Sequence, residues 1–208
     1  MPTCYFDLDG TLVEYDAPFA DVLSDAFAAV GVDADRTLLE TYSEAFFDVL
    51  GDADDPFAAA IDRTDAGVDP AAFSDAMVRT EAEHTVVVDG ADAVLDTLSG
   101  EWRLGVLTNG FGPAQRAKLE TVGLTDRFES VVVSGEVGAR KPEPAIYRAA
   151  EGRLAADSYV FVADDLERDV LPAVDCGWRG VLVGDDVNPS VPDGVETVRS
   201  LADVPTVL

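Results

Sequence analysis

The sequence predicts an α/β protein in which a bundle of helices interrupts a core built on a parallel sheet. Three observations support this prediction. Strand-length apolar runs alternate with helix-length segments through most of the chain, a long early segment has only helical periodicity, and polar side chains follow several of the apolar runs. A chain of 208 residues with 48% hydrophobic residues is also long enough to bury a substantial core.

The predicted strands are nearly continuous apolar runs. Such runs, separated by helices, are typical of a parallel sheet that is covered on both faces. Five clear strands and a weaker sixth are expected at residues 3–8, 104–108, 131–134, 159–163, 180–184 and 195–198. Helices are expected between most of them, at residues 91–99, 113–122, 142–151 and 167–176.

Residues 16–84 break this alternation, because apolar residues recur there at the spacing of a helix face. The clearest sets are Phe19, Val22, Leu23, Ala26, Phe27 and Val30, followed by Leu38, Leu39, Tyr42, Ala45, Phe46, Val49 and Leu50. About four helices are therefore predicted between the first and second strands. We expect a helical domain at 16–85, inserted into a core formed by 1–15 and 86–208.

The composition is strongly acidic. The chain has 41 Asp and Glu residues against 14 Lys and Arg residues, which gives a formal net charge of −27. A surface of this kind repels nucleic acids and anionic membranes, because it has no basic patch to neutralise phosphates. It resembles the surfaces of proteins from salt-accumulating halophiles, where about 1 M salt shortens the screening length to roughly 3 Å. We therefore expect a halophilic protein that is destabilised at low salt.

Other features of the chain indicate its location. No stretch approaches 18 uninterrupted apolar residues, and no signal-like segment stands at the N-terminus. The two cysteines, Cys4 and Cys176, are too few and too far apart for a disulfide framework or a metal motif. These features predict a cytoplasmic protein with no membrane partner.

Polar side chains stand at the ends of four predicted strands. Because the carboxyl ends of parallel strands meet at one edge of a sheet, these groups are expected to converge. Carboxylates, a hydroxyl, an amide and an ammonium together suit a phosphate site with an attached metal site. The groups are Asp7 and Asp9, Thr108 and Asn109, Lys141, and Asp164 with Asp165.

In these segments the chain resembles the haloacid dehalogenase-like hydrolase superfamily, whose four motifs occur in order. The matching segments are Asp7-Leu8-Asp9-Gly10-Thr11, Thr108-Asn109-Gly110, Lys141-Pro142 and Ala163-Asp164-Asp165-Leu166-Glu167-Arg168-Asp169. The resemblance implies a Rossmann-like core with a small helical cap. It also implies a Mg²⁺-dependent phosphatase that hydrolyses a small-molecule phosphomonoester. The fourth motif of the family usually begins Gly-Asp-Ser or similar, so this chain departs from it at Ala163-Asp164-Asp165.

The resemblance assigns two carboxylates to the reaction. Asp7 would be the nucleophile that forms an aspartyl-phosphate. Asp9 would be the general acid that protonates the leaving oxygen and then the base that takes a proton from water. Thr108 and Lys141 are the other expected catalytic residues.

The same resemblance assigns binding roles. The substrate phosphate would be bound by Thr108, Asn109, Gly110 and Lys141. Mg²⁺ would be held by the Asp7 side chain, the Asp9 carbonyl and Asp164, with Asp165 and Asp169 as supporting or alternative ligands.

Other functions share parts of this pattern. A phosphomutase on a sugar phosphate would use the same motifs. A 2-haloacid dehalogenase is less expected because halide departure needs no proton from Asp9, and a non-catalytic binding protein would have lost Asp7, Asp9 or Lys141. The sequence leaves open which ester is hydrolysed, which cap residues select it, and whether the protein is a monomer or a homodimer.

Overall fold

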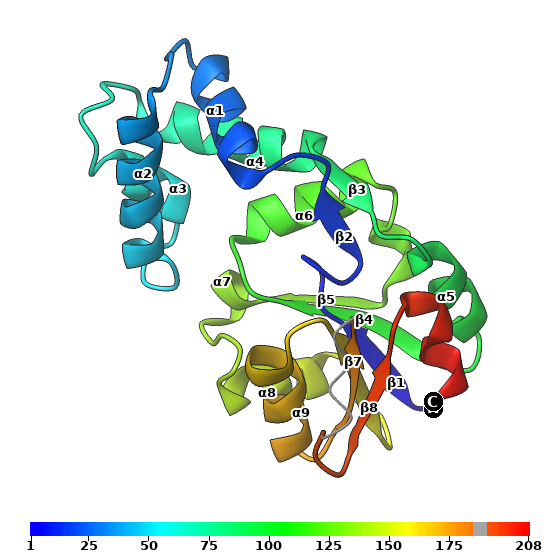
Figure 1. The fold of residues 1–208 in the computed structure, drawn as a ribbon. Helices are drawn as coiled ribbons and strands as arrows, with labels where there is room; N and C mark the ends of the chain where they lie inside the picture. The colour runs from blue at the N-terminus through cyan, green and yellow to red at the C-terminus, as the bar shows by residue number, and fades with distance from the viewer. Residues whose placement is uncertain (185–190) are drawn as a thin grey trace. The chain divides into compact units, whose positions relative to one another are not determined.

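The computed structural model describes residues 1–184 and 191–208. It divides into two compact units, which we call the core unit and the helical unit (Figure 1). The core unit comprises Met1–Glu14, Val87–Asn109 and Leu124–Leu208, and the helical unit comprises Tyr15–Val86 and Gly110–Gly123.

A six-stranded parallel sheet forms the centre of the core unit. Its strand order is β5-β4-β1-β6-β7-β8. The last residue of β1, Phe6, pairs with Val106 and with Val162, so the three central strands finish near one edge of the sheet. The strands are β1 (Thr3–Phe6), β4 (Arg103–Thr108), β5 (Ser130–Val133), β6 (Tyr159–Ala163), β7 (Arg179–Val183) and β8 (Val195–Val198).

Helices cover both faces of this sheet, with α8 and α9 on one side and α5 on the other (Figure 1). On the α8 side, the Trp178 ring stacks on Tyr5 at a centroid distance of 5.5 Å, and the Tyr5 hydroxyl donates to the Ala150 carbonyl at 2.7 Å. The helices are α5 (Ala91–Leu98), η1 (Thr125–Arg127), α7 (Ser134–Val137), α8 (Pro144–Arg153), the π-helical η2 (Leu166–Val170), α9 (Leu171–Asp175) and η3 (Leu201–Thr206). Burial on both faces explains why inner strands such as β1 and β6 are nearly continuously apolar.

The helical unit contains α1 (Phe19–Ala29), α2 (Arg36–Val49), α3 (Pro56–Ile61), α4 (Pro70–Glu83) and α6 (Gly112–Thr121). Aromatic rings fill its centre, where Phe73 lies 4.6 Å from Phe27 and 5.1 Å from Tyr42 between centroids. Three helices begin at an aspartate whose carboxylate accepts a hydrogen bond from a backbone N–H three residues later. These N-caps are Asp35 of α2, Asp55 of α3 and Asp69 of α4.

Two short strands pair where the chain leaves the core unit and returns to it. They are β2 (Val13–Tyr15) and β3 (Thr85–Val87). The sequence analysis missed both, because three residues are too few to establish the alternation of a strand. It also missed α7, where a helical turn begins at Ser134 directly after β5.

The prediction of a parallel α/β fold is confirmed. One difference concerns residues 167–176, which form η2 and α9 instead of one α-helix. Another concerns α6, which the predicted domains place with the core and the structure groups with the helical unit. The ion pair between Lys118 of α6 and Glu81 of α4 belongs to this packing. Whether 16–85 acts as a cap stays a prediction.

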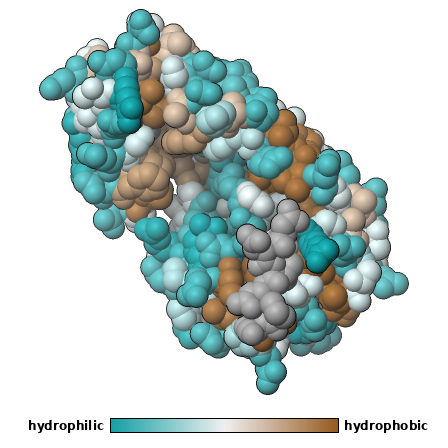
Figure 2. All heavy atoms as spheres, in the orientation of Figure 1, coloured by the Kyte–Doolittle hydropathy of each residue, from teal (hydrophilic) through white to brown (hydrophobic). Residues whose placement is uncertain are grey.

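The surface reflects the acidic composition. Figure 2 shows hydrophilic residues over much of the visible face. Large apolar side chains that are exposed among the described residues are Met1, Phe19, Phe47 and Val86. Within residues 1–184 and 191–208, no helix combines the length and the apolar character needed to cross a bilayer.

Candidate active site

The turn after β1 places Asp7 at the edge of the sheet. The Asp7 amide donates to the Val162 carbonyl of β6 at 2.9 Å, which continues the pairing of the two strands by one residue. Gly10 follows with a φ of +85°, and a Cβ atom there would lie 2.5 Å from Asp164 Oδ2. Glycine is therefore needed at this position both for the backbone conformation and for the close approach of Asp164.

A buried lysine is in contact with Asp7. Lys141 Nζ lies 2.8 Å from Asp7 Oδ1 and 2.7 Å from Asp169 Oδ1, and all three side chains are at most 4% exposed. Asn109 fixes the Lys141 backbone with two hydrogen bonds. Its amide nitrogen donates to the Lys141 carbonyl at 3.0 Å, and its oxygen accepts from the Lys141 amide at 2.8 Å. Segments that follow three different strands thus meet around one ammonium group.

The two oxygens of Asp7 differ in their surroundings. Oδ1 accepts a hydrogen bond from the Leu8 amide at 2.8 Å and also contacts Lys141. Oδ2 makes no hydrogen bond within residues 1–184 and 191–208. The Arg168 guanidinium lies 3.8 Å from it, which is too long for one. Burial raises the pKa of Asp7 to about 6; the Lys141 charge opposes this effect and the Asp169 charge adds to it. The group is therefore an anion at neutral pH with one oxygen left for chemistry.

Oxygens of Asp7, Asp164 and Asp169 form a cluster in which the atoms lie within 4.8 Å of one another. Asp164 is the exposed member, and its Oδ1 accepts a hydrogen bond from the Thr11 hydroxyl at 3.2 Å. Carboxylate oxygens are the ligands that Mg²⁺ prefers, so these residues fit a magnesium ion. Asp169 is already in contact with two cations, Lys141 and Arg168, which makes Asp7 and Asp164 the better candidates for direct ligands.

The other predicted site residues lie as follows. Thr108 ends β4 and is buried, and Asp9 is half-buried in the turn after β1. Asp165 begins η2, where its Oδ1 accepts a hydrogen bond from the Arg168 amide at 2.9 Å. Gly110 is grouped with the helical unit. The roles assigned to these residues stay predictions.

Sequence reasoning gave Arg168 no role. Its guanidinium hydrogen-bonds to Asp169 Oδ2, from Nε at 3.2 Å and from Nη2 at 3.0 Å. A usable signal was its position inside the fourth motif, directly before Asp169. Arg168 is the one cation in that motif, and the resemblance assigns roles only to the carboxylates.

The model of the haloacid dehalogenase-like hydrolase family matches residues 1–177, most of the chain. The chain belongs to this family. The sequence-based family assignment is thereby confirmed. The description of the family as hydrolases agrees with a buried carboxylate that is paired with a lysine at the end of the sheet.

Curated relatives match this chain over part of its length. One is the pyrimidine 5′-nucleotidase YjjG of Escherichia coli, 34% identical over 87 residues, or 40% of this chain and 39% of that protein. Another is the phosphoserine phosphatase of Thermus thermophilus, 37% identical over 98 residues, or 46% of this chain and 39% of that protein. The chain thus spans about two fifths of the length of each of these relatives.

Solved structures share the whole fold. The HAD-hydrolase YfnB from Bacillus subtilis bound to magnesium has a TM-score of 0.74 at 20% identity, and the match covers 100% of this chain and 98% of that one. At this identity the likeness shows the fold alone. It supports the arrangement of the core unit described above.

Proposed function

We propose that this hydrolase is a Mg²⁺-dependent phosphatase that cleaves a small-molecule phosphomonoester through an aspartyl-phosphate on Asp7. The observation that carries the proposal is the buried contact of Lys141 with Asp7, which holds Oδ1 and leaves Oδ2 open. The names of the relatives support it, since they are a nucleotidase and a phosphatase.

In the first step, Asp7 Oδ2 attacks phosphorus and forms the new O–P bond, while the bond from phosphorus to the ester oxygen breaks. Asp9 gives its proton to the departing oxygen, so the leaving group departs as a neutral alcohol. Lys141 balances the charge of the nucleophile and of the phosphoryl oxygens. Thr108 and Asn109 would position the phosphoryl group, and Asn109 already holds Lys141 in place through its backbone.

In the second step, Asp9 takes a proton from water, and the water oxygen attacks phosphorus. The bond to Asp7 Oδ2 breaks, inorganic phosphate leaves, and Asp7 returns to its carboxylate form. Asp7, Asp164 and the Asp9 carbonyl would hold Mg²⁺, with Asp169 and Asp165 supporting them. When bound, the ion offsets the charge of the phosphoryl oxygens.

The decisive experiment is an assay of phosphate release from a panel of phosphomonoesters, with Mg²⁺ and high KCl. The panel includes p-nitrophenyl phosphate, phosphoserine and pyrimidine nucleoside 5′-monophosphates. We expect turnover of at least one ester by the wild type and none above background by Asp7→Asn. Asp157→Asn is the matched control, because Asp157 is 95% exposed and contacts the N-terminal ammonium instead of the site.

Two results would contradict the proposal. Near-normal turnover by Asp7→Asn would show that Asp7 is not the nucleophile. Activity in which solvent ¹⁸O fails to enter the released phosphate, with phosphate returned to a sugar instead, would identify a phosphomutase.

A further inference from the structure

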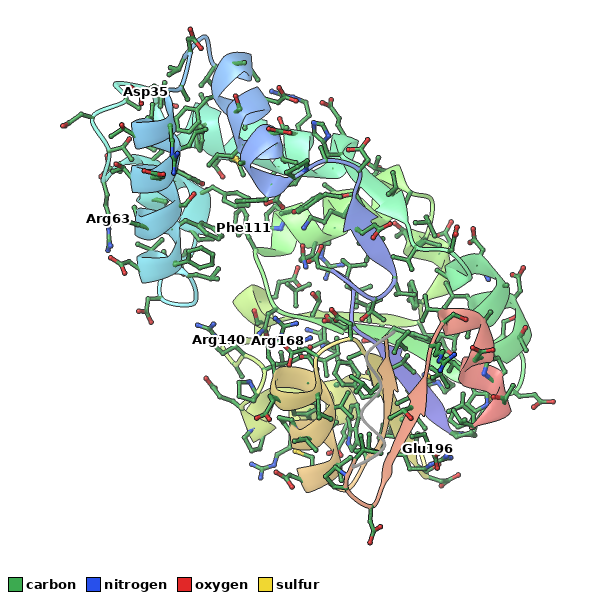
Figure 3. The ribbon with its side chains drawn as sticks, viewed as in Figure 1. Asp35, Arg63, Phe111, Arg140, Arg168 and Glu196 are labelled. Carbon is green, nitrogen blue, oxygen red and sulfur yellow. The ribbon has the colours of Figure 1, made fainter. Side chains whose placement is uncertain are left out.

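Arg168 lies in η2, directly after β6, and is labelled beside α9 in Figure 3. Its guanidinium is near three carboxylates. Nη2 lies 3.0 Å from Asp169 Oδ2 and 3.8 Å from Asp7 Oδ2, and Nη1 lies 3.7 Å from Asp165 Oδ2. Lys141 is completely enclosed, but the Arg168 side chain is 46% exposed. Arg168 is therefore a cation that a solvent-borne ligand can reach.

Most hydrogen-bond donors of this guanidinium have no acceptor among the described residues. Nε and one donor of Nη2 point to the same oxygen, Asp169 Oδ2. Among the described residues, Nη1 makes no hydrogen bond, because its contact with Asp165 is too long. An arginine has five N–H donors in a planar fork that matches the oxygens of phosphate. Three of these donors are left for a ligand.

The distance to the nucleophile decides where such a ligand would lie. A phosphorus atom attacked by Asp7 Oδ2 sits about 3–3.5 Å from that oxygen in a reactive complex. Arg168 Nη2 is 3.8 Å from the same oxygen. The oxygens around that phosphorus are then within reach of the guanidinium after a small side-chain movement, while Asp169 continues to anchor the arginine.

The net charge of the site also favours a phosphate-binding role for Arg168. Four carboxylates (Asp7, Asp164, Asp165 and Asp169) lie around two cations (Lys141 and Arg168), which leaves a formal charge of −2 before any ion binds. Lys141 is in contact with two of these carboxylates already. A phosphate dianion entering this field needs a further positive group to bind well.

We propose that Arg168 is a second phosphate-binding cation of this site. Without substrate, its guanidinium pairs with Asp169 and lies close to Asp7 and Asp165. When a phosphate group arrives, the free Nη donors hydrogen-bond to its oxygens. This inference rests on the proposed function for the identity of the ligand, and it adds a residue that acts mainly on binding.

The test measures binding of inorganic phosphate to the full chain by calorimetry, at saturating Mg²⁺ and constant KCl. One lost charge-assisted pair predicts that Arg168→Gln weakens phosphate binding by roughly 10- to 100-fold. Arg168→Lys is expected to recover part of the loss, because it restores the charge but not the fork. With p-nitrophenyl phosphate, KM is expected to rise by a similar factor and kcat to change by less than about tenfold.

Two controls separate binding from general damage. Arg153→Gln makes the same change of charge at the far end of α8, and phosphate affinity is expected to stay at the wild-type value. Mg²⁺ affinity, measured without phosphate, is expected to be unchanged or higher in Arg168→Gln, because a positive charge has been removed near the carboxylates. Weaker phosphate binding then cannot come from a lost metal.

The outcomes distinguish this inference from the proposed function. Unchanged phosphate affinity in Arg168→Gln, or an equal loss in Arg153→Gln, overturns the inference even when the wild type is an active phosphatase. Arg168-dependent phosphate binding by a wild type that hydrolyses no ester supports the inference and contradicts the proposed function. A wild type that does not bind phosphate at all overturns the inference.

Discussion

The two lysines of the chain are both buried, one in each unit, and their surroundings differ. Lys141 of the core unit contacts Asp7 and Asp169, with Arg168 near the same carboxylates. Lys118 of the helical unit lies 3.2 Å from Glu81 and 4.9 Å from the centroid of the Tyr15 ring. Burial alone therefore does not separate a site residue from a packing residue, since the two lysines are 2% and 3% exposed.

The balance of charge around each residue does distinguish Lys141 from Lys118. Glu81 gives Lys118 a partner of opposite charge inside an aromatic environment, an arrangement that links α6 to α4. Around Lys141 the negative charges outnumber the positive ones. Burial raises the pKa of Asp7, and the Asp169 charge adds to this effect while the Lys141 charge opposes it. An uncompensated, buried charge cluster at the end of a sheet is costly to stability and typical of functional sites.

The largest expected effect is on turnover. Lys141→Ala removes the charge that balances Asp7 and the phosphoryl group, so we expect kcat to fall by about 10³-fold or more. The measurement is p-nitrophenyl phosphate hydrolysis with saturating Mg²⁺, and Arg153→Gln is the control for loss of a single positive charge. A loss of less than tenfold would place Lys141 with Lys118 as a packing residue.

The counterpart in the helical unit is expected to act on stability. Lys118→Met leaves the Glu81 carboxylate buried without this partner, so we expect the free energy of unfolding to fall by about 3–5 kcal/mol. Replacing both residues, as in K118M/E81M, is expected to recover most of that loss. Denaturant unfolding of the full chain in high KCl measures both. Additive effects of the two substitutions would show that the pair is not coupled.

Asp7 is expected to cost stability in metal-free protein. Its pKa of about 6 exceeds the usual 3.8, so the folded state binds more protons than the unfolded state between these values, and the free energy of unfolding falls as pH rises from about 4 to 6. Asp7→Asn removes this term. We expect it to be more stable than the wild type at pH 7 in EDTA, by roughly 2–3 kcal/mol at most. Equal pH profiles for the two proteins would contradict this.

Salt is expected to weaken the repulsion between surface charges and to have little effect on the buried ion pairs. With a net charge of −27, the melting temperature of the wild type should rise by on the order of 5–10 °C between 0.1 M and 2 M KCl. Because salt screens buried pairs poorly, the melting temperature of Lys118→Met should rise by the same amount as that of the wild type over this range of KCl. A melting temperature indifferent to KCl would contradict the halophilic assignment.

The smallest effect concerns His84, at the end of α4. Its Nδ1 lies 2.7 Å from Asp16 Oδ1 and its Nε2 3.0 Å from Asp25 Oδ2, and the hydrogen bond to Asp16 is the main cause of its raised pKa. Its stabilisation is therefore fully present below about pH 6.5 and is lost as pH rises through the higher folded value. Thermal unfolding from pH 6 to 9 should show this loss in the wild type and not in His84→Gln. Parallel curves would rule it out.

Much of the fold was predictable from local patterns. The strands at 159–163 and 195–198 match β6 and β8 to the residue. For β6 the reason is that a buried parallel strand needs an apolar side chain at nearly every position. The four helices expected between the first two long strands are α1 to α4. The strands β2 and β3 were missed because each is stabilised by pairing with a segment about 70 residues away.

The sequence by itself determined which polar groups stand at the strand ends, since strand length and the following turn are local properties. Only the tertiary structure decided which of these groups touch. It brought Asp169 into contact with Lys141, placed Arg168 beside Asp7, and grouped α6 with the helical unit. The physical reason is that these contacts join residues far apart in the chain. Their geometry depends on how strands and helices pack, which no short window of residues encodes.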